Sequence, residues 1–305
     1  MSAIGEFELI RRISKRVKPG PSVVKGIGDD CAVLKYTKGK YLLFTTDMII
    51  EDIHFKRAPA LSKLGIAGSR KGGASPEQIG HKALAVNISD IAACGGTPKW
   101  AVVSVGLPAQ IGYGYTRAIF SGIETLARRF NIDIVGGDTN LSDKLMVSVA
   151  LMGEVKKKEL TLRSGAKDKD IIVLTGPIEE EPDHLNFIPQ LKEARYLVKN
   201  LKVNSMIDIS DGFLSDLNHI LSSSRKGAVV YECMIPRPSE APVNKLLNTG
   251  EQFHLIFTIP PSELKKLPRG TYAVGTIQEK TKGIVYVTMR GKKTRIPLKG
   301  YEHFR

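Results

Sequence analysis

The chain has 305 residues and a formal net charge of +14, from 45 lysine and arginine residues against 31 aspartate and glutamate residues. With 42% hydrophobic and 25% charged residues, its composition is typical of a folded soluble protein and excludes a disordered chain. Its apolar runs are far shorter than the roughly 20 residues that span a bilayer, and no signal peptide opens it, so we expect no membrane segment. The length leaves room for two domains.

The three cysteines, Cys31, Cys94 and Cys233, are widely separated and form no CxxC pair. This spacing indicates neither a disulfide framework nor a zinc site, and it favours a reducing cytoplasm. The positive charge invites a nucleic-acid interpretation, but the basic clusters are short, scattered and without interleaved aromatic residues. A basic enzyme that handles anionic substrates fits better, so nucleic acid is not expected as the main partner.

A β-hairpin is predicted over residues 31–46, where two apolar β-branched runs flank a short glycine-containing loop. Closing this loop between Tyr36 and Tyr41 places Asp30 opposite Asp47. Carboxylates opposed at about 5 Å repel each other unless a cation lies between them, and oxygen ligands at that separation suit Mg²⁺. The alternative is that these acids are ordinary turn residues.

Helical spacing predicts helices over residues 1–18 and 79–94, and the proline- and glycine-rich residues 59–80 read as a loop that could cover a site. On the second helix, Asn87 and Asp90 share an alanine-rich face by three- and four-residue steps. A polar pair on such a face either points to solvent or belongs to a site.

The next pattern predicts strand, helix and strand over residues 100–107, 115–130 and 132–135. The last of these ends in the sequence GGDT. There the missing side chain of Gly137 lets a phosphate approach the backbone, and Asp138 could reach a metal. The alternative is a plain turn into a strand at residues 146–152.

Between residues 153 and 169 the sequence turns polar and basic. We place a domain boundary there, with an N-terminal domain at residues 1–153 and a C-terminal domain at residues 154–305. Arg163 in this stretch is a candidate phosphate clamp, because a guanidinium group binds oxygen atoms in pairs. A solvated linker arginine is the alternative.

The second half predicts a mixed sheet with few helices: strands at residues 171–174, 206–209, 228–231, 253–259, 271–275 and 284–289, and helices at residues 188–199 and 213–221. Asp208, Ser210 and Asp211 crowd one strand-to-helix turn, the kind of place where open α/β folds bind ligands. Helix capping explains a serine and an acid there, but it does not explain Asp208.

The sequence contains neither a GxxxxGK[ST] loop nor a GxGxxG fingerprint. It does place aspartates at strand ends and turns, at positions 30, 47, 90, 138, 208 and 211. Six carboxylates share one cleft only with cations, and carboxylate-held cations neutralise charge in phosphoryl-transfer sites. The residues alone therefore predict an Mg²⁺-dependent enzyme that acts on phosphates.

Seven motifs, in order, resemble a known family: GIGDDCAV, TTD with a downstream HF, HKALAVNISDIAACGGTP, GGDT, TLRSGAK, DISDGFLSDL and the closing GYEHF. Together they are similar to thiamine-monophosphate kinase, of the AIR-synthase-like (PurM-like) ATP-binding superfamily. The resemblance implies an α/β (α+β) fold of two AIR-synthase-like domains, with an N-terminal mixed sheet that has helices on one face. It also implies a homodimer formed through the N-terminal sheets.

The family transfers the γ-phosphoryl group of ATP to thiamine monophosphate with several Mg²⁺ ions. Positions that match its metal ligands are Asp30, Thr45, Thr46, Asp47, Asp90, Asp138, Asp208 and Asp211. Positions that match its ATP contacts are Gly137, Asp138, Arg163 and Ser210. Positions that match its contacts to the thiamine substrate are His54, Glu251 and Phe304.

The chain departs from the family pattern in three places. A glycine-rich stretch is replaced at residues 176–181, the GGED motif reads TGEQ at residues 249–252, and residues 62–78 resemble an insertion. The alternatives are therefore another ATP-using member of the superfamily, of hydrogenase-maturation or AIR-synthetase type, or a basic nucleic-acid-binding protein with a decayed active site.

Overall fold

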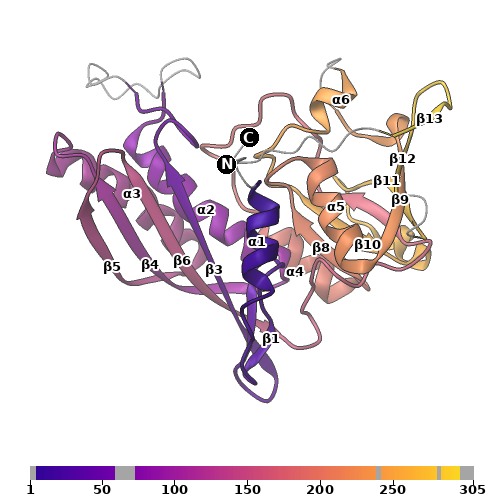
Figure 1. Cartoon of the computed structure of the whole chain (residues 1–305), viewed down its shortest axis with the longest axis horizontal. Coiled ribbons are helices and arrows are strands. Elements are labelled where there is room, and N and C mark those ends of the chain that lie inside the picture. The colour runs from indigo at the N-terminus through magenta and orange to yellow at the C-terminus, as the bar shows by residue number, and fades with distance from the viewer. Residues whose placement is uncertain (1–4, 59–72, 238–241, 280–282, 296–305) are drawn as a thin grey trace.

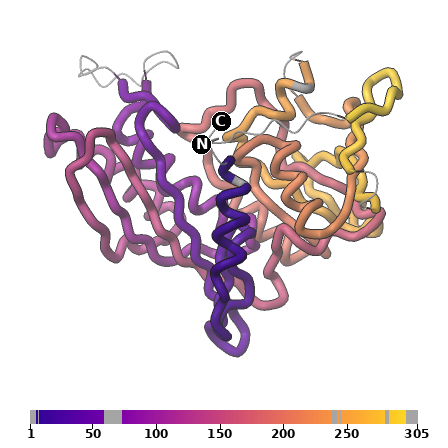
Figure 2. Tube along the Cα trace, viewed as in Figure 1, coloured from indigo at the N-terminus to yellow at the C-terminus, as the bar shows by residue number. Residues whose placement is uncertain are grey.

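The computed structural model describes residues 5–58, 73–237, 242–279 and 283–295. These residues form two β-sheets side by side, each packed with helices (Figure 1). The first half of the chain lies on one side and the second half on the other, with α1 (Glu6–Ser14) in front of their junction in this view (Figure 2). The expected mixed α/β architecture is confirmed.

The first sheet has six strands in the order β1-β2-β3-β6-β4-β5. They are β1 (Val23–Lys25), β2 (Ala32–Lys35), β3 (Lys40–Ile50), β4 (Thr97–Leu107), β5 (Asp133–Leu141) and β6 (Met146–Lys156). β4 and β5 pair in parallel, and the other neighbours are antiparallel. Helices α2 (Pro76–Ala93) and α3 (Tyr113–Phe130) cover one face (Figure 1).

The second sheet has seven strands in the order β13-β12-β9-β11-β7-β10-β8. They are β7 (Ile171–Leu174), β8 (Ser205–Asp208), β9 (Lys226–Tyr231), β10 (Leu255–Ile259), β11 (Tyr272–Glu279), β12 (Ile284–Val287) and β13 (Lys293–Thr294). Its helices are α4 (Leu191–Asn200), α5 (Phe213–Ser224), α6 (Val243–Leu246) and the 3₁₀ turns η1 (Glu232–Met234) and η2 (Pro261–Lys266).

Helix α2 is the element that both halves share. It packs against α3 and the first sheet, and also against α4 and β8 of the second half. This position explains its alanine-rich sequence, because almost every side of the helix is buried. The helix begins at Pro76, three residues before the predicted start, because Ser75 and Gln78 form a capping box that extends it. Side chains on α2 can therefore reach a site built from both halves.

The predicted hairpin is present, but its register was wrong by one residue. Lys35 pairs with Tyr41, and Ala32 pairs with Phe44. The loop closes by a hydrogen bond from the Thr37 amide to the Lys40 carbonyl oxygen, at 3.1 Å, which leaves Tyr36 outside β2. Asp30 is therefore not the cross-strand partner of Asp47, and it lies in the turn that precedes β2.

Of the other expectations about local structure, the one for GGDT was wrong, and the one for residues 59–80 falls mostly outside the described residues. The GGDT sequence does not end a strand, because β5 continues through it and pairs with β4 as far as Leu141. Most of the predicted loop at residues 59–80 lies outside the described residues, and residues 76–80 form the first turn of α2. The domain division at residue 153 remains a proposal, and β6 continues three residues past that point, to Lys156.

Candidate active site

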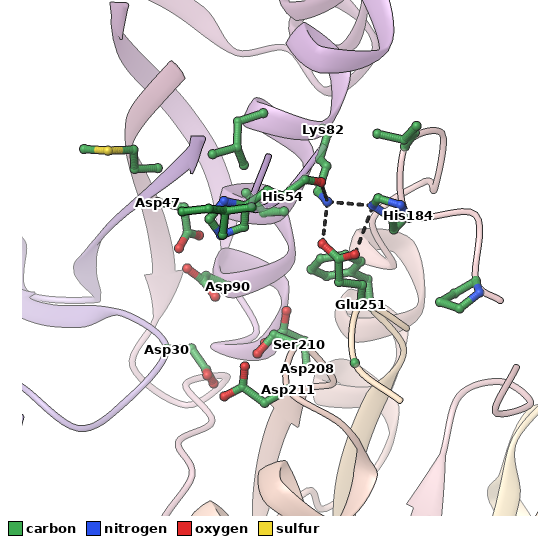
Figure 3. Close-up of a pocket in the computed structure, with 18 of the residues that line it drawn as sticks. Asp30, Asp47, His54, Lys82, Asp90, His184, Asp208, Ser210, Asp211 and Glu251 are labelled. Carbon is green, nitrogen blue, oxygen red and sulfur yellow. Dashed lines mark hydrogen bonds and ion pairs between the residues drawn. The ribbon is translucent and has the colours of Figure 1, made fainter. Parts of the chain in front are cut away.

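A cleft of about 990 Å³ lies between the two halves. One end is lined by aspartates, and the other end carries Lys82, His184 and Glu251 (Figure 3). The walls come from β3 and α2 of the first half and from the loops at residues 181–185 and 248–253 of the second half. Glu6, in the first turn of α1, also lines the cleft.

Three carboxylates meet at the acidic end although they come from distant parts of the chain. Asp30 precedes β2, Asp90 lies on α2, and Asp208 ends β8. One carboxylate oxygen from each lies within 4.8 Å of the others. Figure 3 shows them facing one another across the cleft, with Asp47 and Asp211 beside them. Both halves of the chain thus contribute to a single acidic cluster.

Neighbouring side chains hold these carboxylates in place. The Thr45 hydroxyl donates to Asp90 Oδ2 at 2.5 Å, and the Ser89 hydroxyl donates to Asp208 Oδ2 at 2.6 Å. The guanidinium of Arg163 donates from Nε and Nη2 to Asp30 Oδ1, at 2.9 and 2.6 Å. Arg163 is therefore not a solvated linker residue, because it closes the acidic end of the cleft.

Of the polar pair on α2, Asp90 lines the cleft and Asn87 supports its wall from behind. Asn87 is fully buried, and its Oδ1 accepts a hydrogen bond from the backbone amide of Asp47 at 3.1 Å. Its amide nitrogen donates to the Ala83 carbonyl oxygen at 3.0 Å. Asn87 thus fixes β3 against α2, while Asp90, one turn later, points into the acidic cluster.

Burial and mutual repulsion disfavour ionisation of the cluster. Burial, together with the charge of Asp208, raises the pKa of Asp30 to about 7 despite the opposing effect of Arg163. Burial and the charge of Asp208 raise the pKa of Asp47 to about 6. Burial and the charges of Asp47, Asp208 and Asp30 raise the pKa of Asp90. These carboxylates need cations in order to be ionised together at neutral pH.

The donor set fits Mg²⁺. Among the described residues, Asp30 Oδ2 is a buried oxygen atom without a hydrogen-bond partner, and it belongs to a cluster of three converging carboxylates. Mg²⁺ prefers hard oxygen ligands and is usually held by a few carboxylates together with water and substrate phosphates. A bound cation would pair with this buried oxygen and lower the pKa values of the surrounding carboxyl groups.

The turn after β8 is fixed by a residue that the sequence did not single out. Asp216, in the first turn of α5, accepts hydrogen bonds from the backbone amides of Asp211 and Gly212, both at 3.1 Å. Gly212 has φ +119°, a conformation that favours glycine. An acid five residues after Asp211, at a helix start, was the available signal for this role.

Most of the predicted site residues line the cleft. They are Asp30, Thr45, Thr46, Asp47, His54, Asp90, Arg163, Asp208, Ser210, Asp211 and Glu251. Within the described part of a single copy, Gly137 and Asp138 are not part of this lining. They lie on β5 at the edge of the first sheet, where Asp138 accepts hydrogen bonds from the Thr139 amide and the Asn140 side chain. Phe304 lies outside the described residues.

None of the helices in the described ranges has the length and apolar character that crossing a bilayer requires.

Comparisons with known proteins agree with this geometry. The protein-family model described as AIR synthase related protein, N-terminal domain, matches residues 28–155 of this chain. Thiamine-monophosphate kinase of Bacillus subtilis is 35% identical, over 98% of this chain and 99% of its own length. The solved structure of AaThiL complexed with AMPPCP and TMP is 28% identical with a TM-score of 0.78, covering 98% of this chain and 97% of that chain.

A more distant structure shares the fold alone. Escherichia coli HypE, a hydrogenase maturation protein, is 17% identical with a TM-score of 0.71, covering 97% of this chain and 98% of that chain. The AIR-synthase-like fold is thus confirmed, and the full-length relatives at 28% and 35% identity named above are thiamine-monophosphate kinases. The chain belongs to the thiamine-monophosphate kinase family.

Proposed function

We propose that this protein transfers the γ-phosphoryl group of ATP to thiamine monophosphate with the help of Mg²⁺, giving thiamine diphosphate and ADP. The observation that carries this proposal is the convergence of Asp30, Asp90 and Asp208 from both halves of the chain. Membership of the family and the relative that is complexed with AMPPCP and TMP support the choice of substrates.

In the proposed reaction, Asp30, Asp47, Asp90 and Asp208 would hold Mg²⁺, with Thr45, Thr46 and Asp211 of the same cleft as further ligands. Asp138, which lies outside the cleft of its own copy, would be a ligand in the cleft of a second copy. Bound Mg²⁺ neutralises the charge of the transferred phosphoryl group. Thr45 and Ser89 keep two of the carboxylates oriented, since each donates a hydrogen bond to one of them. Gly137, Asp138, Arg163 and Ser210 contact ATP, and His54, Glu251 and Phe304 contact the thiamine substrate.

The acceptor atom is a phosphate oxygen that is already ionised at neutral pH, so the reaction needs no strong general base. The chain's contribution is then to position the two substrates and to exclude water from the cleft. The catalytic side chains are accordingly ligands and clamps, and no nucleophilic side chain takes part.

We further propose a homodimer formed through the uncovered face of the first sheet. Val102 and Met48 are exposed there, on β4 and β3. Across the sheet, Asp138 on β5 pairs with Ser104 on β4, Ser104 pairs with Ser148 on β6, and Ser148 pairs with Met48 on β3. Met48 lines the cleft. A second copy packed on this face would bring its β5, with Gly137 and Asp138, toward the cleft.

The alternatives have less support. A nucleic-acid-binding protein has no use for a buried carboxylate cluster, which repels phosphates when cations are absent. The hydrogenase maturation protein of Escherichia coli is only 17% identical to the chain, against 35% for thiamine-monophosphate kinase of Bacillus subtilis. We also propose a cytoplasmic location, because Cys31, Cys94 and Cys233 are all free thiols.

The decisive test is the formation of thiamine diphosphate from purified protein, ATP and thiamine monophosphate, followed by chromatography. We expect product with Mg²⁺ and none after EDTA treatment, with activity restored by added Mg²⁺. ATP consumption that depends on a different acceptor would move the protein to another member of the superfamily. The absence of any Mg²⁺-dependent ATP turnover would reject the enzyme.

A further inference from the structure

Lys82 is the most unusual side chain in the cleft, and neither the metal cluster nor the family resemblance gives it a role. It lies on α2 with 1% of its surface exposed, so its charge is buried. Burial lowers the pKa of Lys82, and the nearby carboxylate of Glu251 opposes this effect. Buried lysines are rare unless they are paired, so a specific arrangement must hold this one.

Three acceptors surround its amino group, one for each N–H of a charged lysine. Nζ donates to the carbonyl oxygen of His54 at 2.9 Å, to Nδ1 of His184 at 2.6 Å and to Oε1 of Glu251 (Figure 3). His184 Nδ1 also lies 3.0 Å from the second carboxylate oxygen of Glu251. Because Nδ1 accepts from Lys82, it does not donate to Glu251, so Lys82 contacts the Glu251 carboxylate directly and His184 acts on it by holding Lys82 in place.

The backbone around Glu251 is held in an uncommon conformation. Glu251 has φ +58° and Phe253 has φ +50°, a region that non-glycine residues seldom adopt. Their amides donate to the carbonyl oxygens of Ser210 at 2.7 Å and of Ile209 at 2.9 Å. These bonds aim the Glu251 side chain toward Lys82, across the boundary between the two halves.

The segment that carries His184 directly follows residues 176–181, which depart from the family pattern, and both α2 and the Glu251 loop hold it. On the α2 side, His81 Nε2 lies 2.8 Å from the carbonyl oxygen of Phe187. On the other side, the ring of Phe187 stacks on Phe253 with centroids 4.0 Å apart. The Gln252 side chain makes two hydrogen bonds to the backbone of Glu179. Its Oε1 accepts from the Glu179 amide at 3.0 Å, and its Nε2 donates to the Glu179 carbonyl oxygen at 2.7 Å. Residues 176–181 and 249–252, which both depart from the family pattern, are thus in direct contact.

We propose that Lys82 and His184 are positioning residues that fix the Glu251 carboxylate at the acceptor end of the cleft and thereby determine which acceptor binds. The inference rests on the proposed function, in which Glu251 contacts the thiamine substrate. A carboxylate whose charge is balanced by a buried lysine favours a neutral N–H donor over a cation. It therefore recognises an amino group of the heterocycle, while the aspartate cluster holds the phosphates.

The test measures KM separately for the acceptor, thiamine monophosphate, and for Mg-ATP. Lys82→Met keeps the length of the side chain but removes its charge, and we expect KM for the acceptor to rise at least tenfold while KM for Mg-ATP changes less than twofold. Lys82→Arg restores part of the loss. Lys40→Met is the matched control, since it removes a lysine–glutamate pair, Lys40 with Glu154 at 2.6 Å, elsewhere in the same half. We expect it to change neither KM.

A double-mutant cycle separates positioning from a merely structural role. Glu251→Gln should raise KM for the acceptor as Lys82→Met does, and the double variant should be no worse than Glu251→Gln alone. Effects that multiply, or a parallel rise in both KM values, would overturn the inference. If Lys82→Met does not fold, His184→Ala takes its place in the cycle with the same expectations. A wild-type protein that forms no thiamine diphosphate rejects the proposed function instead.

Discussion

Burial and a neighbouring negative charge act in the same direction on Asp47, and both oppose its ionisation. Its carboxyl lies beside Asp90 and Asp208, and burial together with the charge of Asp208 raises its pKa to about 6. The same carboxylate is needed for Mg²⁺ in the proposed reaction. A substitution at this position should therefore stabilise the metal-free protein and at the same time remove its response to the metal.

The sign of the pH dependence follows from the raised pKa values. A carboxyl whose pKa is higher in the folded state than in the unfolded state, about 3.8 here, binds protons more tightly when folded. Its favourable contribution is complete below the unfolded pKa and is lost as the pH rises through the folded pKa. Each unit of pKa shift corresponds to about 1.4 kcal/mol. Metal-free protein should lose this contribution between pH 4 and the folded values of about 6 and about 7.

The corresponding prediction compares wild type with Asp47→Asn in EDTA. Thermal unfolding should give Asp47→Asn the higher Tm at pH 8, and the difference should shrink as the pH falls below 6. Added Mg²⁺ should raise the Tm of wild type at pH 8 more than that of the variant. A difference in Tm that stays constant from pH 5 to pH 8 would contradict the raised pKa of Asp47.

At the scale of elements, the close packing of α2 on α3 sets where Lys82 and Asp90 enter the cleft. The two helices approach through glycines in both directions. A Cβ at Gly80 would lie 1.9 Å from the carbonyl oxygen of Ile119, and one at Gly122 would lie 2.0 Å from that of Glu77. Any larger residue must push the helices apart.

We expect Gly80→Ala to lower the free energy of unfolding by about 1–3 kcal/mol, because the backbones must separate to admit the methyl group. Gly114→Ala is the control, since nothing lies within 4 Å of a Cβ there and alanine favours a helix. Urea denaturation followed by circular dichroism measures both. Equal stability of the two variants would show that the helices can move apart without cost.

How far the elements could be predicted depends on how local their signals are. The apolar run of β7 was predicted with its observed ends, Ile171 and Leu174, because both faces of that strand are buried. The register of the β2–β3 hairpin could not be derived, because a single hydrogen bond between Thr37 and Lys40 decides it. Asp30 lines the cleft despite the wrong register, since its position depends on the turn before β2 and not on cross-strand pairing.

At the scale of the whole molecule, the cleft depends on contacts between the two halves of the chain. Sequence patterns describe local structure and say least about such long-range contacts. Lys82 sits in an alanine-rich helix, and its partner Glu251 is 169 positions away in the chain. His184 lies in a stretch without a recognised motif. Spacing along the chain carries no information about such pairs, whereas the aspartates were accessible through local turn motifs.

The proposed homodimer makes a prediction at this scale. Val102→Lys places a charge on the uncovered sheet face, where 40% of the Val102 side chain is exposed. We expect wild type to have the mass of two chains by light scattering and Val102→Lys to have the mass of one, with reduced activity. Tyr113→Lys is the control, because Tyr113 is 82% exposed at the start of α3 on the helical side. Monomeric wild type with full activity would rule out the shared site.

The most direct test of the central claim is the change in Tm that Mg-ATP produces in wild type and in Asp47→Asn, because a ligand that binds only the folded state raises Tm by an amount set by its affinity. If carboxylates from both halves hold cations around a polyphosphate, Mg-ATP raises the Tm of wild type, ATP in EDTA does not, and Asp47→Asn loses the shift. A wild-type Tm that ignores Mg-ATP, or a variant that responds as strongly as wild type, would contradict this account of the cleft.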